Sequence, residues 1–405
     1  MKSKTREELP IKIIDGDRGN NYPKQNEFSS YGHCLFLSTK NVPDTKFDFS
    51  ESQFIDKKKD ELLRSGKLER GDIVFTTRGT IGNLALYDED IPYENIRINS
   101  GMVIFQCLNR INNYFLYSYL QNPNFQKQIE NFSSGTAQPQ LPIRDMKKLV
   151  FSIPEEAIQV KIGNFFRILD NKINTLQNQN KILEQTAQAI FKSWFVDFDG
   201  VTEFEDSELG QIPKGWSVVN MSDVIEINPT RNLKKGIIAP YLGMTDIPRY
   251  SSRISGFYLK AFTSGMKFMN GDTLVARITP SLENGKTAFV DFLQNDEIGW
   301  GSTEYIVLRP KVPIPAEYGY CFARTDDFRS HAILNMTGTS GRQRVPESCF
   351  DEYSVVKPPT DLTIVFGNIT KKLFFQIVNN ANMIVSLTKT RDALLPKLMS
   401  GEIRV

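Results

Sequence analysis

The chain has 405 residues, of which 40% are hydrophobic and 24% are charged, and its formal net charge at pH 7 is +2. This length predicts two or three domains that each bury a core, and the nearly balanced charge confines any nucleic-acid surface to a local basic face. The scattered four cysteines and two histidines argue against a zinc motif. The charged N-terminus and the lack of a long apolar run predict neither a signal peptide nor a membrane span.

The first segment, residues 1–153, is predicted to be irregular and β-rich. A turn at Gly71 and Asp72 leads into a short apolar run, which predicts a buried strand, and the strand runs directly into Arg78. A second polar loop, 135–142, ends in a proline. Arg, Gln, Asn and Thr are side chains that hydrogen-bond base edges, and Arg also binds phosphate. The candidate DNA-contacting residues of this segment are therefore Thr76, Thr77, Arg78, Thr80, Asn83, Gln138 and Gln140.

One long helix is predicted after Pro154. Apolar residues recur in alternating steps of four and three from Ile158 to Trp194, with Asn180 as the one polar residue of the seam. This spacing is typical of a coiled coil rather than of a generic amphipathic helix. The central seam positions are Leu169, Ile173, Leu176, Asn180 and Leu183.

The second segment, residues 201–357, shows the same local pattern. Gly271 and Asp272 precede an apolar run that ends at Arg277, and a polar loop follows at 341–346. Because an arginine follows the strand in both segments, we interpret Arg78 and Arg277 as counterparts that both face the ligand. The alternative is a surface arginine paired with an acid. The candidate DNA-contacting residues here are Arg277, Thr279, Ser281, Asn284, Lys286, Arg342, Gln343 and Arg344.

A second long helix is predicted for residues 358–405, with Asn380 and Arg391 as polar interruptions of its seam. Pro396 is expected to kink or end it. Each long helix alone would expose an apolar stripe, so we expect the two helices to pack on each other, in either a parallel or an antiparallel sense. The central seam positions of this helix are Leu373, Ile377, Asn380, Ile384 and Leu387.

The chain also repeats itself. A shift of 204 positions lays residues 151–154 over 355–358 and places Gly163 on Gly367, without a gap through most of both helices. A repeat of this kind is strong evidence about architecture. A duplicated unit fits a target that also has two ends, such as duplex DNA that is read at two half-sites.

The sequence gives only weak evidence for a catalytic activity of this chain. Residues 122–125 (NPNF) resemble the loop with which adenine methyltransferases hold a flipped base, but the third residue is Asn rather than Pro and no glycine-rich cofactor loop precedes it. We interpret this string as a helix-terminating turn. The chain also lacks a phosphate-binding loop for ATP. A self-contained methyltransferase or nuclease with fused recognition domains is therefore the second hypothesis, and a scaffold without DNA binding is the third.

Five strings together resemble the DNA-specificity subunits of type I restriction–modification enzymes. They are 14–19 (IDGDRG), 71–83 (GDIVFTTRGTIGN), 193–199 (SWFVDFD), 209–216 (LGQIPKGW) and 394–403 (LLPKLMSGEI). The resemblance implies an α/β (α+β) fold with an internal pseudo-two-fold repeat. Two similar target-recognition domains, 1–153 and 201–357, would be separated by two long helices, 154–200 and 358–405, which pair as an antiparallel coiled coil.

The same resemblance implies a non-catalytic role in a prokaryotic cytoplasm. Each domain would read one half of a bipartite double-stranded DNA site, and the helices would set the gap between the halves. Two modification subunits would bind S-adenosylmethionine and methylate adenine at N6, while restriction subunits would use ATP and Mg²⁺. No cofactor or metal is expected on this chain. The second segment lacks the Arg-Gly-Thr turn of the first, so the two halves should read different base sequences.

The two seam asparagines lead to a specific prediction about helix pairing. Asn180 is level with Asn380 if the helices run antiparallel, whereas a parallel pair would set Asn180 beside Ile384. Two buried amides can satisfy each other, while one alone against an apolar side chain would be destabilised by about 1–3 kcal/mol. We therefore predict that Asn180 and Asn380 face each other.

Overall fold

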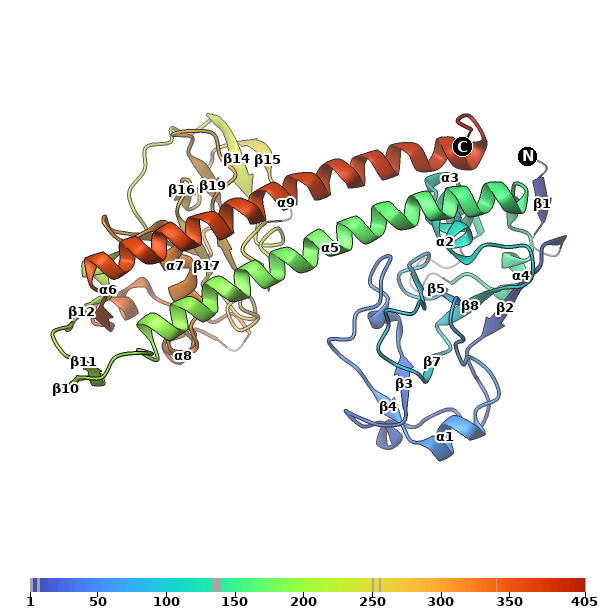
Figure 1. The fold of residues 1–405 in the computed structure, drawn as a ribbon, viewed down its shortest axis with the longest axis horizontal. Helices are drawn as coiled ribbons and strands as arrows, with labels where there is room; N and C mark the ends of the chain where they lie inside the picture. Colours follow the sequence, from blue (N-terminus) through green and yellow to red (C-terminus); the bar gives the residue numbers. More distant parts are fainter. Residues whose placement is uncertain are drawn as a thin grey trace. The chain divides into compact units, whose positions relative to one another are not determined.

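The computed structural model describes residues 3–5, 8–132, 140–249, 251–254, 256–339 and 341–404. The chain forms two compact units, called unit 1 (Met1–Asn174 with Val385–Val405) and unit 2 (Thr175–Ile384). The two longest helices, α5 (Glu156–Phe195) and α9 (Thr360–Ser400), each belong partly to both units (Figure 1). Among the described residues, no helix combines the length and the apolar character that a membrane crossing requires.

Unit 1 contains two main sheets. The first is antiparallel throughout, with the order β2 (Ile11–Asp15), β8 (Met102–Cys107), β5 (Ile73–Thr76) and β6 (Leu84–Leu86). The second has the order β4 (Phe54–Ile55), β3 (Cys34–Leu37) and β7 (Ile96–Ile98), with β3 and β7 parallel. The unit is completed by the pair β1 (Ser3–Thr5) and β9 (Val150–Ser152) and by the helices α1 (Lys57–Leu62), α2 (Asn113–Gln121), α3 (Pro123–Phe132) and α4 (Ile143–Met146).

Unit 2 has a similar pair of sheets, with one more strand in the second sheet. Its antiparallel sheet has the order β13 (Ile225–Ile227), β20 (Tyr305–Pro310), β17 (Thr273–Ala276) and β18 (Thr287–Phe289). The other sheet has the order β15 (Tyr258–Ala261), β14 (Ile238–Leu242), β19 (Gly299–Gly301) and β16 (Lys267–Phe268), with β14 and β19 parallel. The remaining elements are β10 (Phe204–Ser207), β11 (Gly210–Pro213), β12 (Ser217–Asn220), β21 (Ser354–Lys357), α6 (Met221–Val224), α7 (Ala316–Ala323) and α8 (Asp326–Leu334).

The two predicted strands are confirmed as β5 and β17, and every residue of both is buried. The turns before them use glycine in the left-handed region, with φ of +92° at Gly71 and +86° at Gly271, where a side chain would be strained. The next residue closes each turn, because the carboxylates of Asp72 and Asp272 accept backbone N–H bonds from three residues earlier, at 2.8 and 2.7 Å. The turn chemistry therefore explains both strand starts.

The cores follow from the alternation of side chains along the central strands. In unit 1, Phe75 and Phe105 point to the side that α2 covers, while Val74 and Ile104 point to the side of the second sheet. Unit 2 repeats this division of its central strands between a helix-facing cluster and a sheet-facing cluster. Because both faces are covered, the central strands are apolar on both sides, as the uninterrupted apolar runs indicated.

Within unit 2 the two long helices run antiparallel. The Asn380 side chain donates to Oδ1 of Asn180 at 2.9 Å, while Trp194 and Phe195, further along α5, contact Phe366, which lies earlier in α9. The predicted facing of Asn180 and Asn380 is thus confirmed, and a parallel pairing is excluded here. Asn380 also accepts from Nε2 of Gln376 at 2.8 Å, so its buried amide is bonded at both ends.

Within unit 1 the pairing contains an ion pair. Arg391 of α9 lies 3.1 Å from Asp170 of α5, and the hydroxyl of Tyr114 donates to the same carboxylate at 3.0 Å. The polar interruption that Arg391 makes in the seam is therefore neutralised. The central seam positions of both helices, with the two asparagines and Arg391, are buried or half-buried, whereas Ile168 and Ile182 outside the seam are 69% and 60% exposed.

Pro396 does not end α9, so the expectation that the helix could end there is wrong. The helix continues to Ser400. Proline removes one intrahelical hydrogen bond, but Leu395, Leu398 and Met399 around it are at most 5% exposed and pack into the unit 1 core. The burial of this last turn stabilises the helix against the loss of one bond.

The glycines that the repeat superposes, Gly163 and Gly367, serve the same purpose in the two units. A Cβ on Gly163 would lie 2.5 Å from Oδ1 of Asn112, the residue that caps α2, and a Cβ on Gly367 would lie 2.9 Å from Cβ of Pro315, the residue before α7. Both glycines let a long helix touch the start of the helix that covers the central sheet. The two glycines that the 204-residue shift superposes therefore have the same packing role.

Candidate nucleic-acid interface

The register of the central sheet brings distant loops of unit 1 to one end. Strand β2 ends at Asp15, opposite Val103, and β5 ends at Thr76, opposite Met102. The loops after β2 and β5 and the turn before β8 therefore leave the same end of the sheet. The loop that contains Gln140 joins them there through a β-bridge between Arg78 and Gln140. We call this end, with residues 15–18, 78–80, 100 and 140, the loop edge of unit 1.

The predicted contact residues of unit 1 divide into two groups. Arg78, Thr80 and Gln140 are exposed at the loop edge, and within the described part of the chain the Arg78 side chain has no hydrogen bond or ion pair. A cleft of about 290 Å³ lies beside Arg78 and Gln140 and is also lined by Asp15 and Arg18. These residues can reach a ligand that lies across the edge.

The second group, Thr76, Thr77 and Asn83, is buried or half-buried inside the unit. Thr76 and Thr77 are at most 4% exposed, and their hydroxyls donate to backbone carbonyls inside the unit, Thr77 to Gly101 at 3.0 Å. The burial of these two threonines argues against a contact with DNA, because their hydroxyls are already bonded inside the unit. Asn83 is half-buried and donates to the carbonyl of Val42 at 3.0 Å. Gln138 lies outside the described residues.

Unit 2 forms a corresponding loop edge. Strand β17 ends at Ala276, opposite Tyr305, and Ile278 forms a β-bridge with Arg344. The backbone N–H of Arg277 donates to the carbonyl of Glu304 at 3.0 Å. The loop edge of unit 2 consists of residues 277–281, 304 and 342–347.

The two bridges show that Arg78 and Arg277 are not counterparts, which corrects the sequence interpretation. Arg78 bridges Gln140 in unit 1, and the residue in the same place in unit 2 is Ile278, which bridges Arg344. Arg277 instead takes the place of the buried Thr77. Neighbouring residues of an extended chain point to opposite sides, so a difference of one position turns the side chain to the other face.

Arg277 accordingly lies partly inside the unit. Its side chain is 20% exposed, and Nη1 lies 3.3 Å from the Glu347 carboxylate, as the acid-paired alternative requires. Lys286 donates to the carbonyl of Met244 at 2.7 Å, and the Thr279 hydroxyl lies 3.8 Å from the Met336 sulfur. Ser281, Asn284 and Gln343 are half-buried, whereas Arg342 and Arg344 are exposed.

Arg344, one of the two exposed arginines of this edge, forms an ion pair with Glu304. Its Nε lies 2.9 Å from both carboxylate oxygens of Glu304, and its Nη2 lies 2.8 Å from Oε1. These hydrogen bonds and the charge of Glu304 raise the pKa of Arg344 above its usual value. Arg344 therefore stays charged and is held in one orientation.

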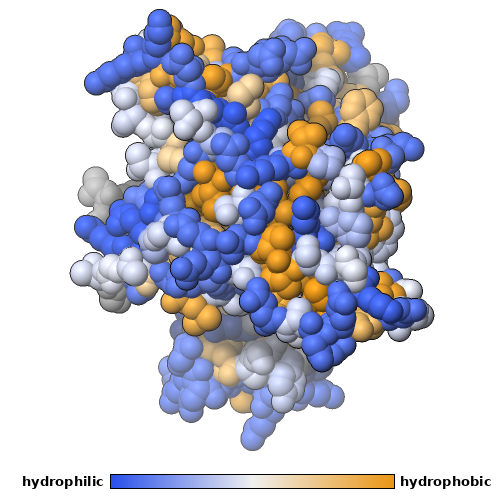
Figure 2. Space-filling view, turned by 90° about the vertical axis from the view of Figure 1, so that its left-hand side faces the viewer, coloured by the Kyte–Doolittle hydropathy of each residue, from blue (hydrophilic) through white to orange (hydrophobic). Residues whose placement is uncertain are grey.

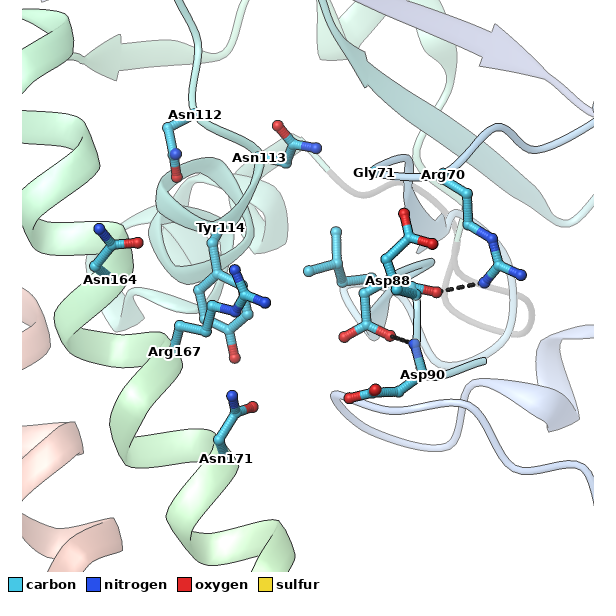
Figure 3. Close-up of a pocket in the computed structure, with 12 residues that line it drawn as sticks. Arg70, Gly71, Asp88, Asp90, Asn112, Asn113, Tyr114, Asn164, Arg167 and Asn171 are labelled. Atoms are coloured by element: carbon cyan, nitrogen blue, oxygen red, sulfur yellow. Dashed lines mark hydrogen bonds between the residues drawn. The ribbon is translucent and has the colours of Figure 1, made fainter. Parts of the chain in front are cut away.

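Other clefts lie elsewhere in each unit. In unit 1, Asn164, Arg167 and Asn171 of α5 face Asp88 and Asp90 across a cleft of about 290 Å³ (Figure 3). In unit 2, a cleft of about 500 Å³ includes apolar residues from the end of α5, from β11 and from α8 among its lining. Apolar side chains also gather between hydrophilic ones on the face drawn in Figure 2. Among the described residues, His, Cys, Asp and Glu form no group of three that could hold a metal ion.

Comparison with known proteins shows which proteins the chain resembles. A family model for the type I restriction modification DNA specificity domain matches residues 12–185. The chain is 24% identical to the type I restriction enzyme MjaIX specificity subunit of Methanocaldococcus jannaschii, over 83% of this chain and 78% of the relative. It is also 24% identical to the HindI specificity subunit of Haemophilus influenzae, over 96% of this chain and 98% of the relative. The chain is thus similar to type I specificity subunits over most of its length.

The fold agrees with that family. A crystal structure of the type I restriction–modification S subunit from M. genitalium superposes with a TM-score of 0.56, covering 98% of this chain and 95% of that one. The sequence identity is 17%, so this likeness concerns the fold alone.

The candidate residues predicted from the sequence did not include Arg18, which lies at the loop edge of unit 1. It belongs to the string 14–19 that carries part of the family resemblance, but it was not counted among the contact residues. The available signal was an acid and an arginine three positions apart at the end of a strand, Asp15 and Arg18. Only the register of β2 against β8 shows that this end of the strand lies beside Arg78.

Proposed function

We propose that this chain is the sequence-reading subunit of a type I restriction–modification complex, in which each unit binds one half of a bipartite double-stranded DNA site. The observation that carries the proposal is the loop edge, which occurs in both units at the same end of sheets with the same strand order. Loops at the end of a rigid sheet can present different side chains without a change of fold. The two edges differ in their residues, which fits two different half-site sequences.

The catalytic steps in this proposal belong to partner subunits. Two modification subunits would bind S-adenosylmethionine and methylate adenine at N6, and restriction subunits would supply ATP- and Mg²⁺-dependent cleavage. The contribution of this chain is binding and orientation. The exposed arginines and polar loops at the two edges are suited to phosphate and base contacts.

The long helices would hold the two readers at a set spacing as an antiparallel coiled coil with an internal two-fold repeat. Antiparallel contacts within each unit support this role, namely the Asn180–Asn380 hydrogen bond in unit 2 and the Asp170–Arg391 ion pair in unit 1. The superposed glycines Gly163 and Gly367 support the repeat, since each docks its helix in the same way.

The test is selection of binding sites by the full chain from a pool of random duplexes. We expect one bipartite sequence with a gap of constant length. If Arg78 contacts a base, Arg78→Ala should weaken the sequence preference of one half-site and leave the other unchanged. If Arg78 contacts phosphate, the variant should bind all sequences more weakly by the same factor. Lys214→Ala is the matched control, since Lys214 forms a surface ion pair with Glu203 on the β10–β11 hairpin, outside both edges. Selection of one continuous sequence, or of none, would refute the proposal.

A further inference from the structure

Each loop edge contains an arginine that a carboxylate holds side-on. In unit 1, Nε and Nη2 of Arg18 lie 3.1 and 3.2 Å from the two carboxylate oxygens of Asp15, and Nη2 also donates to the carbonyl of Ser100 at 3.2 Å. In unit 2, Arg344 has the corresponding bidentate contact with Glu304, and its Nη1 donates to the carbonyl of Arg342 at 3.3 Å.

The two arginines are equally accessible. Their side chains are 48% and 47% exposed, and the carboxylates that hold them are 29% and 23% exposed. They do not occupy equivalent positions in the repeat, since Arg18 follows β2 whereas Arg344 lies on the bridging loop. The partners of both come in part from the turn before the neighbouring strand, Ser100 before β8 and Glu304 before β20. The two edges therefore reach the same arrangement from different loops.

This arrangement favours a base contact over a phosphate contact. The charge of each arginine is balanced by its carboxylate, so the pair adds little to the attraction of a phosphate. Holding the side chain in place removes part of the conformational entropy that binding would otherwise cost. The unpaired Arg78, in contrast, keeps a full exposed charge at the unit 1 edge.

We propose that Arg18 and Arg344 each hydrogen-bond to O6 and N7 of a guanine in the half-site that their own unit reads, with Asp15 and Glu304 as positioning residues. Guanine presents two acceptors side by side in the major groove, which match the two donors of a guanidinium edge. Each carboxylate accepts from Nε and Nη2 and turns the Nη1–Nη2 edge outward, and on Arg18 the guanine replaces the Ser100 carbonyl as the second acceptor of Nη2. This inference rests on the proposed function and adds a base identity to each half-site.

The test compares binding-site selection by the full-length wild type with that by Arg18→Ala and Arg344→Ala. Arg18→Ala should lose its preference for guanine at one position of one half-site, by about 5- to 150-fold, and keep the other half-site unchanged. Arg344→Ala should do the reverse, so each variant serves as the control for the other. Lys214→Ala should alter neither half-site.

Asp15→Asn and Glu304→Gln separate positioning from direct contact. Each should relax the same guanine position as the matching arginine variant, while affinity for random DNA is retained or rises because the arginine charge is no longer balanced. Thermal melting of all variants identifies any loss of fold. Uniform weakening on all sequences, with a salt slope reduced by about one, would show a phosphate contact and overturn the inference. So would unchanged sequence preference, whereas a wild type that selects no bipartite sequence would instead refute the proposed function.

Discussion

The paired asparagines allow a prediction with an internal asymmetry. Asn380 is 3% exposed, whereas Asn180 is half-buried and also donates to the carbonyl of Ile377 at 3.4 Å. Replacing Asn180 with Leu leaves the Asn380 amide inside the seam without its acceptor. Replacing Asn380 with Leu leaves an Asn180 that can still reach water. We therefore expect Asn180→Leu to destabilise unit 2 more than Asn380→Leu.

The magnitude follows from the burial. A buried amide that loses its partner is destabilised by about 1–3 kcal/mol, and Asn380 is buried enough for the upper half of that range. The double variant Asn180→Leu/Asn380→Leu removes both amides and adds apolar contact at about 0.8 kcal/mol per buried methylene. It should be at least as stable as the wild type. The coupling energy between the two positions is then about 1–3 kcal/mol in favour of matched residues.

The assay is differential scanning calorimetry of the full chain, which resolves transitions of separate units. For a domain of 150–250 residues, 1 kcal/mol shifts Tm by about 2–4 °C, so Asn180→Leu should lower the unit 2 transition by several degrees. The unit 1 transition serves as the internal control. If either single variant is as stable as the double variant, the two amides do not satisfy each other and the reasoning is refuted.

Three further predictions concern the packing of the units. Gly163→Ala should destabilise unit 1 in urea unfolding. Overpacking against Asn112 and the backbone of Phe115 costs about 1–3 kcal/mol, which exceeds the gain in helix propensity of about 1 kcal/mol. The control Lys161→Ala, on the exposed face of the same helix, should not show this loss of stability. Burial raises the pKa of Asp72 to about 6, above the unfolded value of about 3.9. The folded unit therefore binds the proton more tightly, and stability should fall as pH rises from about 4 to about 6; the melting temperature of Asp72→Asn should lack this part of the pH dependence, and wild-type and variant profiles that run parallel from about pH 4 to about pH 6 would contradict the prediction. Arg391→Met should destabilise unit 1 by about 1–3 kcal/mol, because Asp170 keeps its hydrogen bond from Tyr114 but loses the ion pair with Arg391. The double variant Arg391→Met/Asp170→Leu should recover most of that loss in the same unfolding assay.

Much of the fold could be predicted from local patterns. The four-three spacing predicted α5 and α9, the Gly-Asp turns predicted β5 and β17, and the two asparagines predicted the antiparallel sense that unit 2 shows. These features depend on residues within a few positions of one another, or on the simple geometry of two rods. The helix end predicted at residues 122–125 is confirmed at Asn122, which follows α2, whereas Pro123, Asn124 and Phe125 already belong to α3.

The candidate site depended on contacts between distant segments. Placing Arg18 beside Arg78 and Gln140 requires the register of β2, β8 and β5 and a bridge across 62 positions of sequence. The corresponding bridge in unit 2 shows that Arg277 takes the place of Thr77. The comparison of short motifs had instead matched Arg277 with Arg78, one residue further along. Sequence alone determined which side chains were available and where the strands and helices begin. The tertiary structure decided which of them face solvent at one edge, because a shift of one residue in an extended strand turns a side chain from the surface into the core.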